Sequence, residues 1–388
     1  MSALVTDQFR ILNASNFVDS VLDTNNSYYV FLGLSNAKDP AVGFGRTSTW
    51  DTQNVGNGPN PVDNLQYMTH YRDTSLFGKR ITGDNVRRVI RKVQWTSNTQ
   101  YDMYRHDYSS TNESPNSKSA RLYDSNYYVI NKDFRVYICI DNGSSGSLVK
   151  GKRSKFEPTS TDLIPTKFEG DGYSWKYLFT VSPSDIVKFD STEYIVLPNN
   201  WSTSTDPEIS RVRDGATTSG QIKKVYIESA GTSGYGDGTY NILGDGTGAT
   251  VTIETSSGQI TKATVENGGS GYTWGIVDLG VGNGAKLLPI IPPSKGHGYD
   301  IYTELGADRV LVYSRFDDST KDFPIDTKFA QVGLIKNPQS QSASVTYTGS
   351  TYSSLYAIKL SDSYSGTPVI GEKITQVQVG VGTAKGYV

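Results

Sequence analysis

Cysteine and histidine are scarce in this chain, and their scarcity removes several kinds of chemistry. The one cysteine, Cys139, lies in the apolar run VYICI, so the chain has neither a disulfide framework nor a paired-cysteine metal site. We expect Cys139 to be a small buried hydrophobe. The three histidines, His70, His106 and His297, lie in no known catalytic motif. The motifs HExxH, GxxxxGK(S/T) and GxSxG are absent as well, which argues against an enzyme and against a bound cofactor or metal.

Long apolar runs and an excess of one charge are also missing. No window approaches 18 consecutive apolar residues, and the N-terminal MSALVTDQFR has no charged region followed by an apolar one. We therefore expect no membrane span and no export signal. Because 37 Lys and Arg balance 39 Asp and Glu, no overall field attracts the chain to nucleic acid or to anionic membranes.

Glycine and tyrosine are abundant, with 39 and 26 residues, whereas methionine occurs 3 times. This balance favours strands and turns over helical bundles. The segments 122–142 and 169–181 are dense in aromatic and β-branched residues, which suit half-buried strands. We expect a mainly β fold, with strands in RVYICID, YSWKYLFTV, EYIVLP, ADRVLVYSRF and KFAQVGLIKNP.

A first helix is predicted at about residues 7–21. Phe9, Leu12, Phe17 and Val21 recur there at roughly helical spacing behind Thr6, whose hydroxyl can cap the first turn. The following SYYVFLGL reads as a strand.

A second helix is predicted over residues 84–95, in GDNVRRVIRKVQW. Its apolar residues fall at i, i+3, i+4 and i+7, and Asp84 stands at its start. The opposite face would carry four cations, which either face solvent or dock against an acidic neighbouring subunit: Arg87, Arg88, Arg91 and Lys92.

A glycine-rich stretch at 231–285 forms a separate module, since 15 of the 39 glycines fall in it, with one lysine and no arginine or proline. It repeats internally: SAGTSGY and GDGTGATV recur as NGGSGY and GVGNGAKL at an offset of roughly 36 residues, which predicts two similar β units packed together. Asp237 and Asp245 lie in its glycine-rich turns. Tight turns explain these aspartates better than a calcium-binding β-roll does, because the second unit lacks aspartates at matching positions.

Two pairs of ionisable groups are candidates for a catalytic centre. Asp102 and His106 could share a helical face, but a hydrogen-bonded surface pair explains them more simply. Glu169 and Asp171 could be paired carboxylates of a glycosidase, although the tight EGDGY turn already accounts for Asp171. Neither pair supports an enzymatic assignment.

The order of several segments resembles a known family. They are VTDQFR, YYVFLG, the NGPNPVD turn behind Trp50, VRRVIRKVQW, VYICID, EGDGYSWKYLF, TEYIVLP and QVGLIKNP. Together they resemble the baseplate wedge subunits called gene product eight in contractile-tailed bacteriophages, over residues 1 to about 210 and 300 to 338. The resemblance implies a layered β-sandwich with short helices in its loops. It also implies a non-enzymatic homodimer in the virion tail baseplate, assembled in the host cytoplasm, that contacts other wedge proteins.

The chain departs from that family pattern in two places. We expect a β-sandwich wedge core at 1–214 and 299–338, interrupted by a glycine-rich β insert of two similar units at 215–298. A C-terminal β module follows at 339–388, and its abrupt end in a strand-like pattern suggests a longer natural chain. An alternative function is a host-surface module that binds a receptor or glycan through the insert; a tail-associated hydrolase is the third hypothesis.

Large assemblies use Tyr, Trp and Arg as interface anchors, so residues of these types are the candidates for partner contact. Burial in the core is the competing explanation for the tryptophans. The candidates are Trp50, Trp95, Tyr173, Trp175 and the basic face Arg87, Arg88, Arg91 and Lys92.

Overall fold

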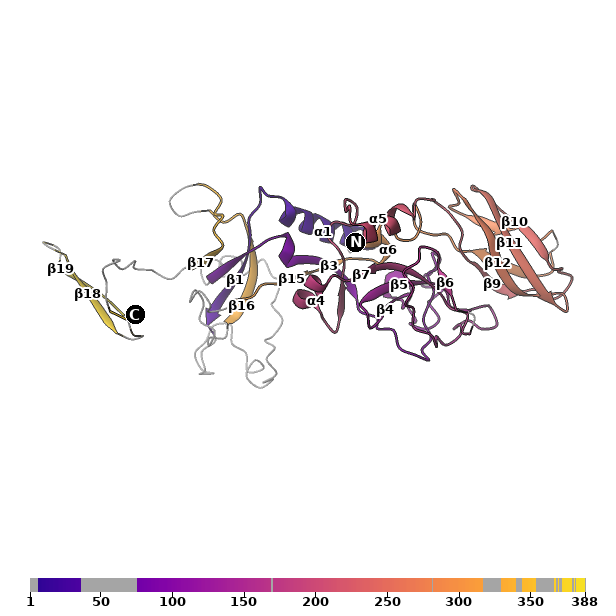
Figure 1. Ribbon diagram of the computed structural model, residues 1–388, viewed down its shortest axis with the longest axis horizontal. Helices are drawn as coiled ribbons and strands as arrows, with labels where there is room; N and C mark the ends of the chain where they lie inside the picture. Colours follow the sequence, from indigo (N-terminus) through magenta and orange to yellow (C-terminus); the bar gives the residue numbers. More distant parts are fainter. Residues whose placement is uncertain are drawn as a thin grey trace. The chain divides into compact units, whose positions relative to one another are not determined.

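Antiparallel β-sheets make up most of the regular structure, and the helices are few and short (Figure 1). The predicted mainly β fold is therefore confirmed. The computed structural model describes residues 6–35, 75–168, 170–280, 282–316, 329–339, 344–353, 366–367, 369, 372–378, 380 and 382–387. The described residues form two compact units. The first unit contains the described residues of Met1–Val30, Lys79–Pro324 and Leu334–Gly349. The second unit contains the described residues of Phe31–Gly78, Ile325–Gly333 and Ser350–Val388.

Helix α1 (Asp7–Leu22) opens the first unit, as predicted. The Thr6 hydroxyl accepts the Phe9 amide at 3.3 Å and so caps the first turn. The side chains that the helix buries lie three or four residues apart, which places them in one stripe: Ile11, Ala14, Val18 and Val21. Phe9 and Leu12, predicted on the packed face, are instead 51% and 55% exposed, because the stripe is rotated by about one residue.

The stripe of α1 packs into a small core shared with strand β1 (Tyr28–Ser35). Val18 and Val21 meet Tyr28 and Val30 of that strand in this core. Strand β1 lies in a four-stranded sheet of order β16–β1–β2–β17, whose other members are β2 (Ser75–Ile81), β16 (Phe329–Lys336) and β17 (Thr351–Ser353).

The main core of the first unit surrounds a sheet of order β4–β5–β7–β6. The members are β4 (Tyr128–Ile130), β5 (Arg135–Asp141), β6 (Thr166–Lys167) and β7 (Ser174–Thr180). Five consecutive residues are buried in each of β5 and β7, so both faces of these strands are covered. Cys139 is fully buried in β5, and burial raises the pKa of its thiol well above the ordinary value, which confirms the predicted structural role.

The predicted helix at 84–95 is wrong. The segment begins with a single 3-10 turn, η2 (Gly83–Asn85), and continues as strand β3 (Val86–Arg91). Strand β3 pairs antiparallel with β8 (Tyr194–Val196) and with β15 (Arg309–Val312). The apolar spacing fits a helix, but Val and Ile prefer strands, and two partner strands from distant parts of the chain satisfy the backbone of β3.

Besides η2, the described residues of this unit contain four further short helical segments between strands. Helices α4 (Pro183–Phe189) and α5 (Pro207–Asp214) each begin with a proline behind a capping side chain, while α6 (Ile301–Glu304) and the 3-10 turn η3 (Leu122–Asp124) lie in loops.

The described residues of the glycine-rich module form six strands around a hydrophobic core. One sheet has the order β12–β11–β10–β13 and the other pairs β14 with β9. The strands are β9 (Val225–Ala230), β10 (Gly238–Gly244), β11 (Thr247–Ser256), β12 (Gln259–Ser270), β13 (Gly275–Val277) and β14 (Ala285–Pro289). Gly248 and Gly284, which occupy equivalent places in the sequence repeat, have φ angles of 81° and 78°, a conformation that favours glycine.

The tyrosines of the repeat make equivalent hydrogen bonds across the module. The Tyr235 hydroxyl accepts the amides of Asn283 and Ala285 at 2.9 and 3.0 Å, and the Tyr272 hydroxyl accepts the amide of Ala249 at 3.2 Å. Ala249 and Ala285 end the matching GDGTGA and GVGNGA motifs. Each copy of the motif is therefore held by the tyrosine of the other copy.

Beyond residue 372, strands β18 (Lys373–Gln378) and β19 (Gly382–Tyr387) form an antiparallel hairpin. This hairpin lies in the stretch 339–388, where a C-terminal β module is expected.

Candidate functional site

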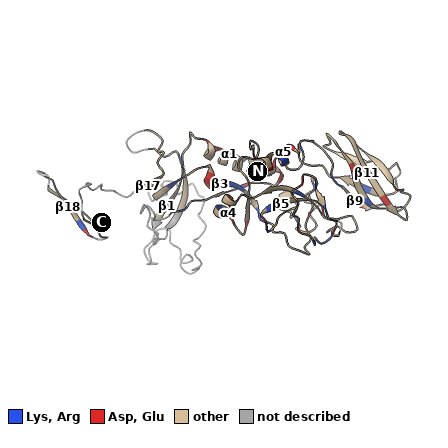
Figure 2. Cartoon of the chain, in the orientation of Figure 1, with Lys and Arg blue, Asp and Glu red and all other residues tan. Residues whose placement is uncertain are grey.

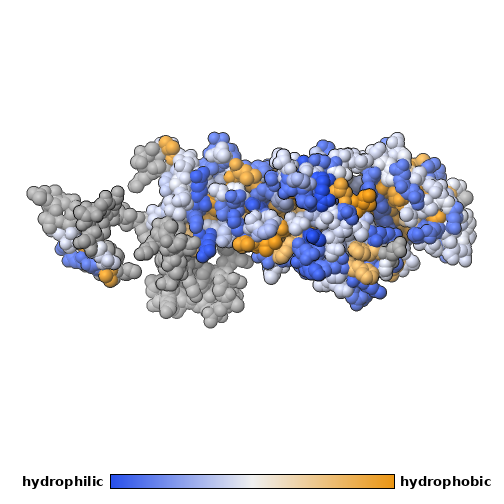
Figure 3. All heavy atoms as spheres, viewed as in Figure 1, coloured by the Kyte–Doolittle hydropathy of each residue, from blue (hydrophilic) through white to orange (hydrophobic). Residues whose placement is uncertain are grey.

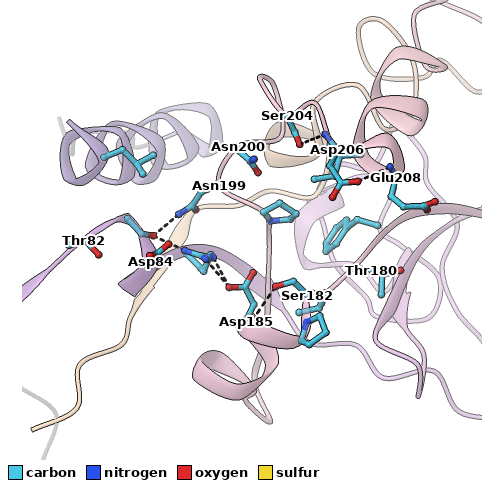
Figure 4. Close-up of a pocket in the computed structure, with 18 of the residues that line it drawn as sticks. Thr82, Asp84, Thr180, Ser182, Asp185, Asn199, Asn200, Ser204, Asp206 and Glu208 are labelled. Carbon is cyan, nitrogen blue, oxygen red and sulfur yellow. Dashed lines mark hydrogen bonds and ion pairs between the residues drawn. The ribbon is translucent and has the colours of Figure 1, made fainter. Parts of the chain in front are cut away.

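A groove of about 710 Å³ lies in the first unit beside the C-terminal end of β7 (Figure 4). One part of its wall is apolar and carries Leu22, Tyr177, Phe179, Val181, Pro183, Pro198 and Ile209. The other part carries Thr82, Gly83, Asp84, Arg87, Thr180, Ser182, Asp185, Asn199, Asn200, Ser204, Asp206 and Glu208. Apolar walls with polar groups around them are typical of binding sites.

An ion pair between β3 and α4 holds one side of the groove. Arg87 donates from Nε and Nη2 to Asp185 Oδ1 at 2.9 and 2.8 Å, and both side chains are largely buried. Nη1 of Arg87 also donates to the carbonyls of Gly83 and Val86 at 2.7 and 2.8 Å. The guanidinium is therefore fully engaged and braces the wall at Asp185, which is labelled in Figure 4.

The other side of the groove is the start of α5. The Asp206 carboxylate caps this helix by accepting the Glu208 amide at 2.8 Å, and Pro207 takes the first helical position. Glu208 pairs with Arg211 at 2.7 Å on the exposed surface. Asn199 also lines the groove, and its Nδ2 donates to the carbonyls of Gly83 and Val86 at 3.3 and 2.6 Å.

The groove carries an excess of negative charge. Four carboxylates and one guanidinium line it. Arg87 neutralises Asp185, whereas Asp84 and Asp206 form no ion pair with any of the described residues. Lys and Arg are otherwise interspersed with Asp and Glu along the described ribbon (Figure 2). A partner group that brings positive charge would therefore be attracted to this groove in particular.

The four cations predicted on one face do not share a face. Arg87 lines the groove, while Arg88 is 3% exposed and pairs with Asp19 of α1 at 2.8 Å. Arg91 is exposed and donates to two loop carbonyls, and Lys92 pairs with Asp190 at 3.1 Å. The prediction of a basic docking face depended on a helix at this segment. In a strand, successive side chains point to opposite sides, so the four cations cannot form one face.

Two of the predicted aromatic anchors belong to the core. Tyr173 and Trp175 are 0% and 2% exposed, and their rings stack at 5.4 Å between centroids. The Tyr173 hydroxyl donates to the Lys152 carbonyl at 2.8 Å, and burial raises the pKa of Tyr173. Trp95 is partly buried and donates to Ser154 Oγ at 3.1 Å. Core packing, the competing explanation, accounts for these three residues; Trp50 lies outside the described residues.

Asp102 and His106 are not a pair on a shared helix. Asp102 is fully buried and accepts the amides of Asn116, Ser117 and Asn126, so it organises a loop. His106 Nδ1 accepts the Ile291 amide at 3.1 Å, and partial desolvation of the ring lowers the pKa of His106, so the ring is neutral. The expected surface pair is wrong because Asp102 is buried and accepts loop amides, whereas His106 is exposed and bonds to a different segment.

Other carboxylates also have structural partners. Asp171 is 2% exposed and accepts the amides of Lys155, Phe156 and Tyr173, which agrees with the predicted turn; Glu169 lies outside the described residues. Glu304 is buried and accepts from His297 Nδ1 at 2.6 Å and from the Gly298 amide at 2.7 Å. These carboxylates all fix the backbone or a neighbouring side chain.

The two aspartates of the glycine-rich turns act in the same way. Asp237 accepts the Thr255 amide at 2.6 Å, and Asp245 accepts the Thr273 amide at 2.9 Å. Hydrogen bonds from these threonines lower the pKa of both aspartates. Among the described residues, no group of three or more His, Cys, Asp or Glu could hold a metal ion, and no helix is long and apolar enough to cross a membrane.

Sequence reasoning missed the groove. The sequence does mark the starts of the two helices beside the groove. In Ser182-Pro183 and Asp206-Pro207 a capping residue is followed by proline, and these pairs begin α4 and α5. Nothing local in the sequence places these starts next to Asp84 and Arg87.

No family model matches this chain. The chain is similar to the baseplate wedge protein gp8 of Enterobacteria phage T4, with 23% identity over 230 residues. The match takes in 53% of this chain and 63% of the relative, so the chain spans less than two thirds of the length of the relative that it matches. This distant similarity relates the chain to a phage baseplate protein.

Proposed function

We propose that this chain is a structural component of a phage tail baseplate wedge. In this proposal it is a homodimeric scaffold that joins other wedge proteins, catalyses no reaction and needs no cofactor. It acts in the virion, after assembly in the host cytoplasm. The observation that carries the proposal is the similarity to baseplate wedge protein gp8.

The side chains of the first unit support this proposal. Its core is rich in large aromatic residues, and the buried carboxylates Asp102, Asp171 and Glu304 hold the backbone in place. A protein with rigid walls around an open groove can hold a partner segment without losing much entropy. Such construction suits a component whose work is to keep surfaces in position.

The homodimer is tested by light scattering of the purified chain after size exclusion. We expect a mass twice that of one chain, together with incorporation of the protein into tail complexes when the other baseplate proteins are present. A strict monomer that joins no tail complex would contradict the proposal.

A second candidate function, host-surface binding, is favoured by one observation in the glycine-rich module. Trp274, Leu243 and Ile276 are 55%, 48% and 56% exposed, and the last two are direct partners across β10 and β13. Asp245 holds the turn before β13 by accepting the amides of Thr273 and Trp274 at 2.9 and 3.2 Å. Apolar residues elsewhere form small separate patches on the face drawn in Figure 3. A fixed, exposed tryptophan in an apolar cluster is a suitable anchor for a receptor or a glycan.

This second function predicts a defect in adsorption and none in assembly. Particles with Trp274→Ala should form normally but adsorb to host cells about tenfold less, because hot-spot aromatic residues often carry more than ~1.4 kcal/mol of binding. Phe9→Ala, which removes an exposed aromatic ring from α1, is the matched control. Normal adsorption of Trp274→Ala particles would count against a receptor-binding role, and loss of particles would favour the scaffold.

A further inference from the structure

We propose that the groove receives the basic segment 148–156 of a second copy of this chain, in a reciprocal pairing about a two-fold axis. The inference rests on the proposed homodimer and names the surfaces that form it. Two features of the described residues carry it: the acidic groove, and an exposed basic segment that lies at the other end of the same strand.

The segment LVKGKRSKF joins positive charge to exposed apolar side chains. Leu148 and Val149 are 43% and 48% exposed, and Phe156 is 46% exposed. The four cations of the segment are all exposed, and none forms an ion pair with any described residue: Lys150, Lys152, Arg153 and Lys155. Unpaired cations beside exposed apolar groups are the complement of an acidic groove with an apolar wall.

The backbone of this segment is held in place while its charged side chains are exposed. The Leu148 amide donates to the Ser145 carbonyl at 3.0 Å, and the Lys152 amide donates to the Asn142 carbonyl at 2.9 Å. The Ser154 amide donates to the Thr99 carbonyl at 2.8 Å, and the Lys155 amide donates to Asp171 Oδ2 at 2.7 Å. A segment fixed in this way loses little backbone entropy when it binds.

The segment and the groove lie at opposite ends of β7. The Tyr173 hydroxyl, just before β7, donates to the Lys152 carbonyl, whereas Phe179 and Thr180 at the other end line the groove. The seven residues of β7 span roughly 20 Å at about 3.3 Å per residue. With its backbone pinned at one end of the strand, the segment cannot enter the groove of its own chain.

Two copies related by a two-fold axis perpendicular to β7 can place each segment at the groove of the other copy. Their β7 strands then run in opposite directions, and each segment meets the groove of the other copy. Such an interface is isologous, because the same two surfaces are used twice and the pairing closes as a dimer. The cations would face Asp84, Asp206 and Glu208, and the apolar residues of the segment would pack on Phe179 and Pro198.

A charge exchange between the two surfaces tests the proposal, with dimerisation measured by sedimentation equilibrium. The groove variant carries Asp84→Lys and Glu208→Lys, and the segment variant carries Lys150→Glu and Lys155→Glu. We expect each variant to raise the dimer dissociation constant by at least about tenfold, since like charges then face each other. The chain with all four changes should recover dimerisation, because the lysines introduced into the groove then face the glutamates introduced into the segment.

Glu266→Lys supplies the control, since Glu266 is an exposed residue of β12 in the glycine-rich module and this change should leave dimerisation unaltered. Circular dichroism spectra and thermal midpoints show whether each variant is folded. A dimer that tolerates both variants, or a fourfold variant that recovers nothing, overturns the groove assignment and leaves the homodimer standing. A wild-type chain that stays monomeric overturns the homodimer and this inference with it.

Discussion

Replacing Trp175 with alanine is expected to lower the free energy of unfolding by about 3–5 kcal/mol, the cost of removing a large aromatic side chain from a packed core. Trp175 is 2% exposed, stacks on Tyr173 at 5.4 Å and meets the edge of Tyr101 at 5.7 Å. The cavity left behind lies between strands that are covered on both faces, so the surrounding residues have little room to collapse into it.

Urea unfolding followed by far-UV circular dichroism measures this cost without depending on tryptophan fluorescence. Trp274→Ala makes the same chemical change at a residue that is 55% exposed, and it should shift stability by less than about 0.5 kcal/mol. Trp175→Phe should lie between the two, because a smaller ring still stacks on Tyr173. Equal unfolding midpoints for Trp175→Ala and Trp274→Ala would show that Trp175 is not a core residue.

Arg88→Ala is expected to cost about 2–4 kcal/mol, because it removes hydrogen bonds of a buried charge together with its packing. Arg88 donates to Asp19 Oδ1 at 2.8 Å and to Ser15 Oγ at 3.3 Å, and its guanidinium lies 4.4 Å from the centre of the Tyr302 ring. Asp19 is itself 63% exposed, so water can solvate it after the change, which keeps the cost below that of leaving a buried charge without a partner.

Arg91→Ala is the matched control for Arg88→Ala, since Arg91 lies three residues further along β3 and is exposed. Its loss should cost at most about 1 kcal/mol, because its hydrogen bonds to the carbonyls of Asp124 and Ser125 are replaced by water. Thermal or urea unfolding compares the two. If the segment were a helix with a solvated basic face, both substitutions would leave the free energy of unfolding nearly unchanged. That result would contradict strand β3.

The elements with strong local signals were predictable. Strand β5 coincides with RVYICID and β7 with most of YSWKYLFTV, because runs of β-branched and aromatic residues are compatible with burial on both faces. Helix α1 was predictable from Thr6 and the apolar spacing behind it. Its exposed Phe9 and Leu12 show that the same spacing did not reveal which stripe faces the core.

The segment at 84–95 shows why a periodic pattern can fail. Val86, Val89, Ile90 and Val93 fit a helical stripe, yet a strand buried on both sides also tolerates apolar residues at these positions. The choice depends on β8 and β15, which lie more than about 100 residues further along the chain and supply the hydrogen bonds. No window of the sequence contains that information.

Composition alone was enough to predict a mainly β chain, because residue types that favour strands and turns act locally. The place of each charge was decided only by the tertiary structure. Arg88 is buried because Asp19, 69 residues before it, accepts its hydrogen bond, and Arg87 braces the groove because Asp185, 98 residues after it, does the same. Burial of a charge depends on partners that folding brings together, and those contacts lie between segments that are far apart in the chain.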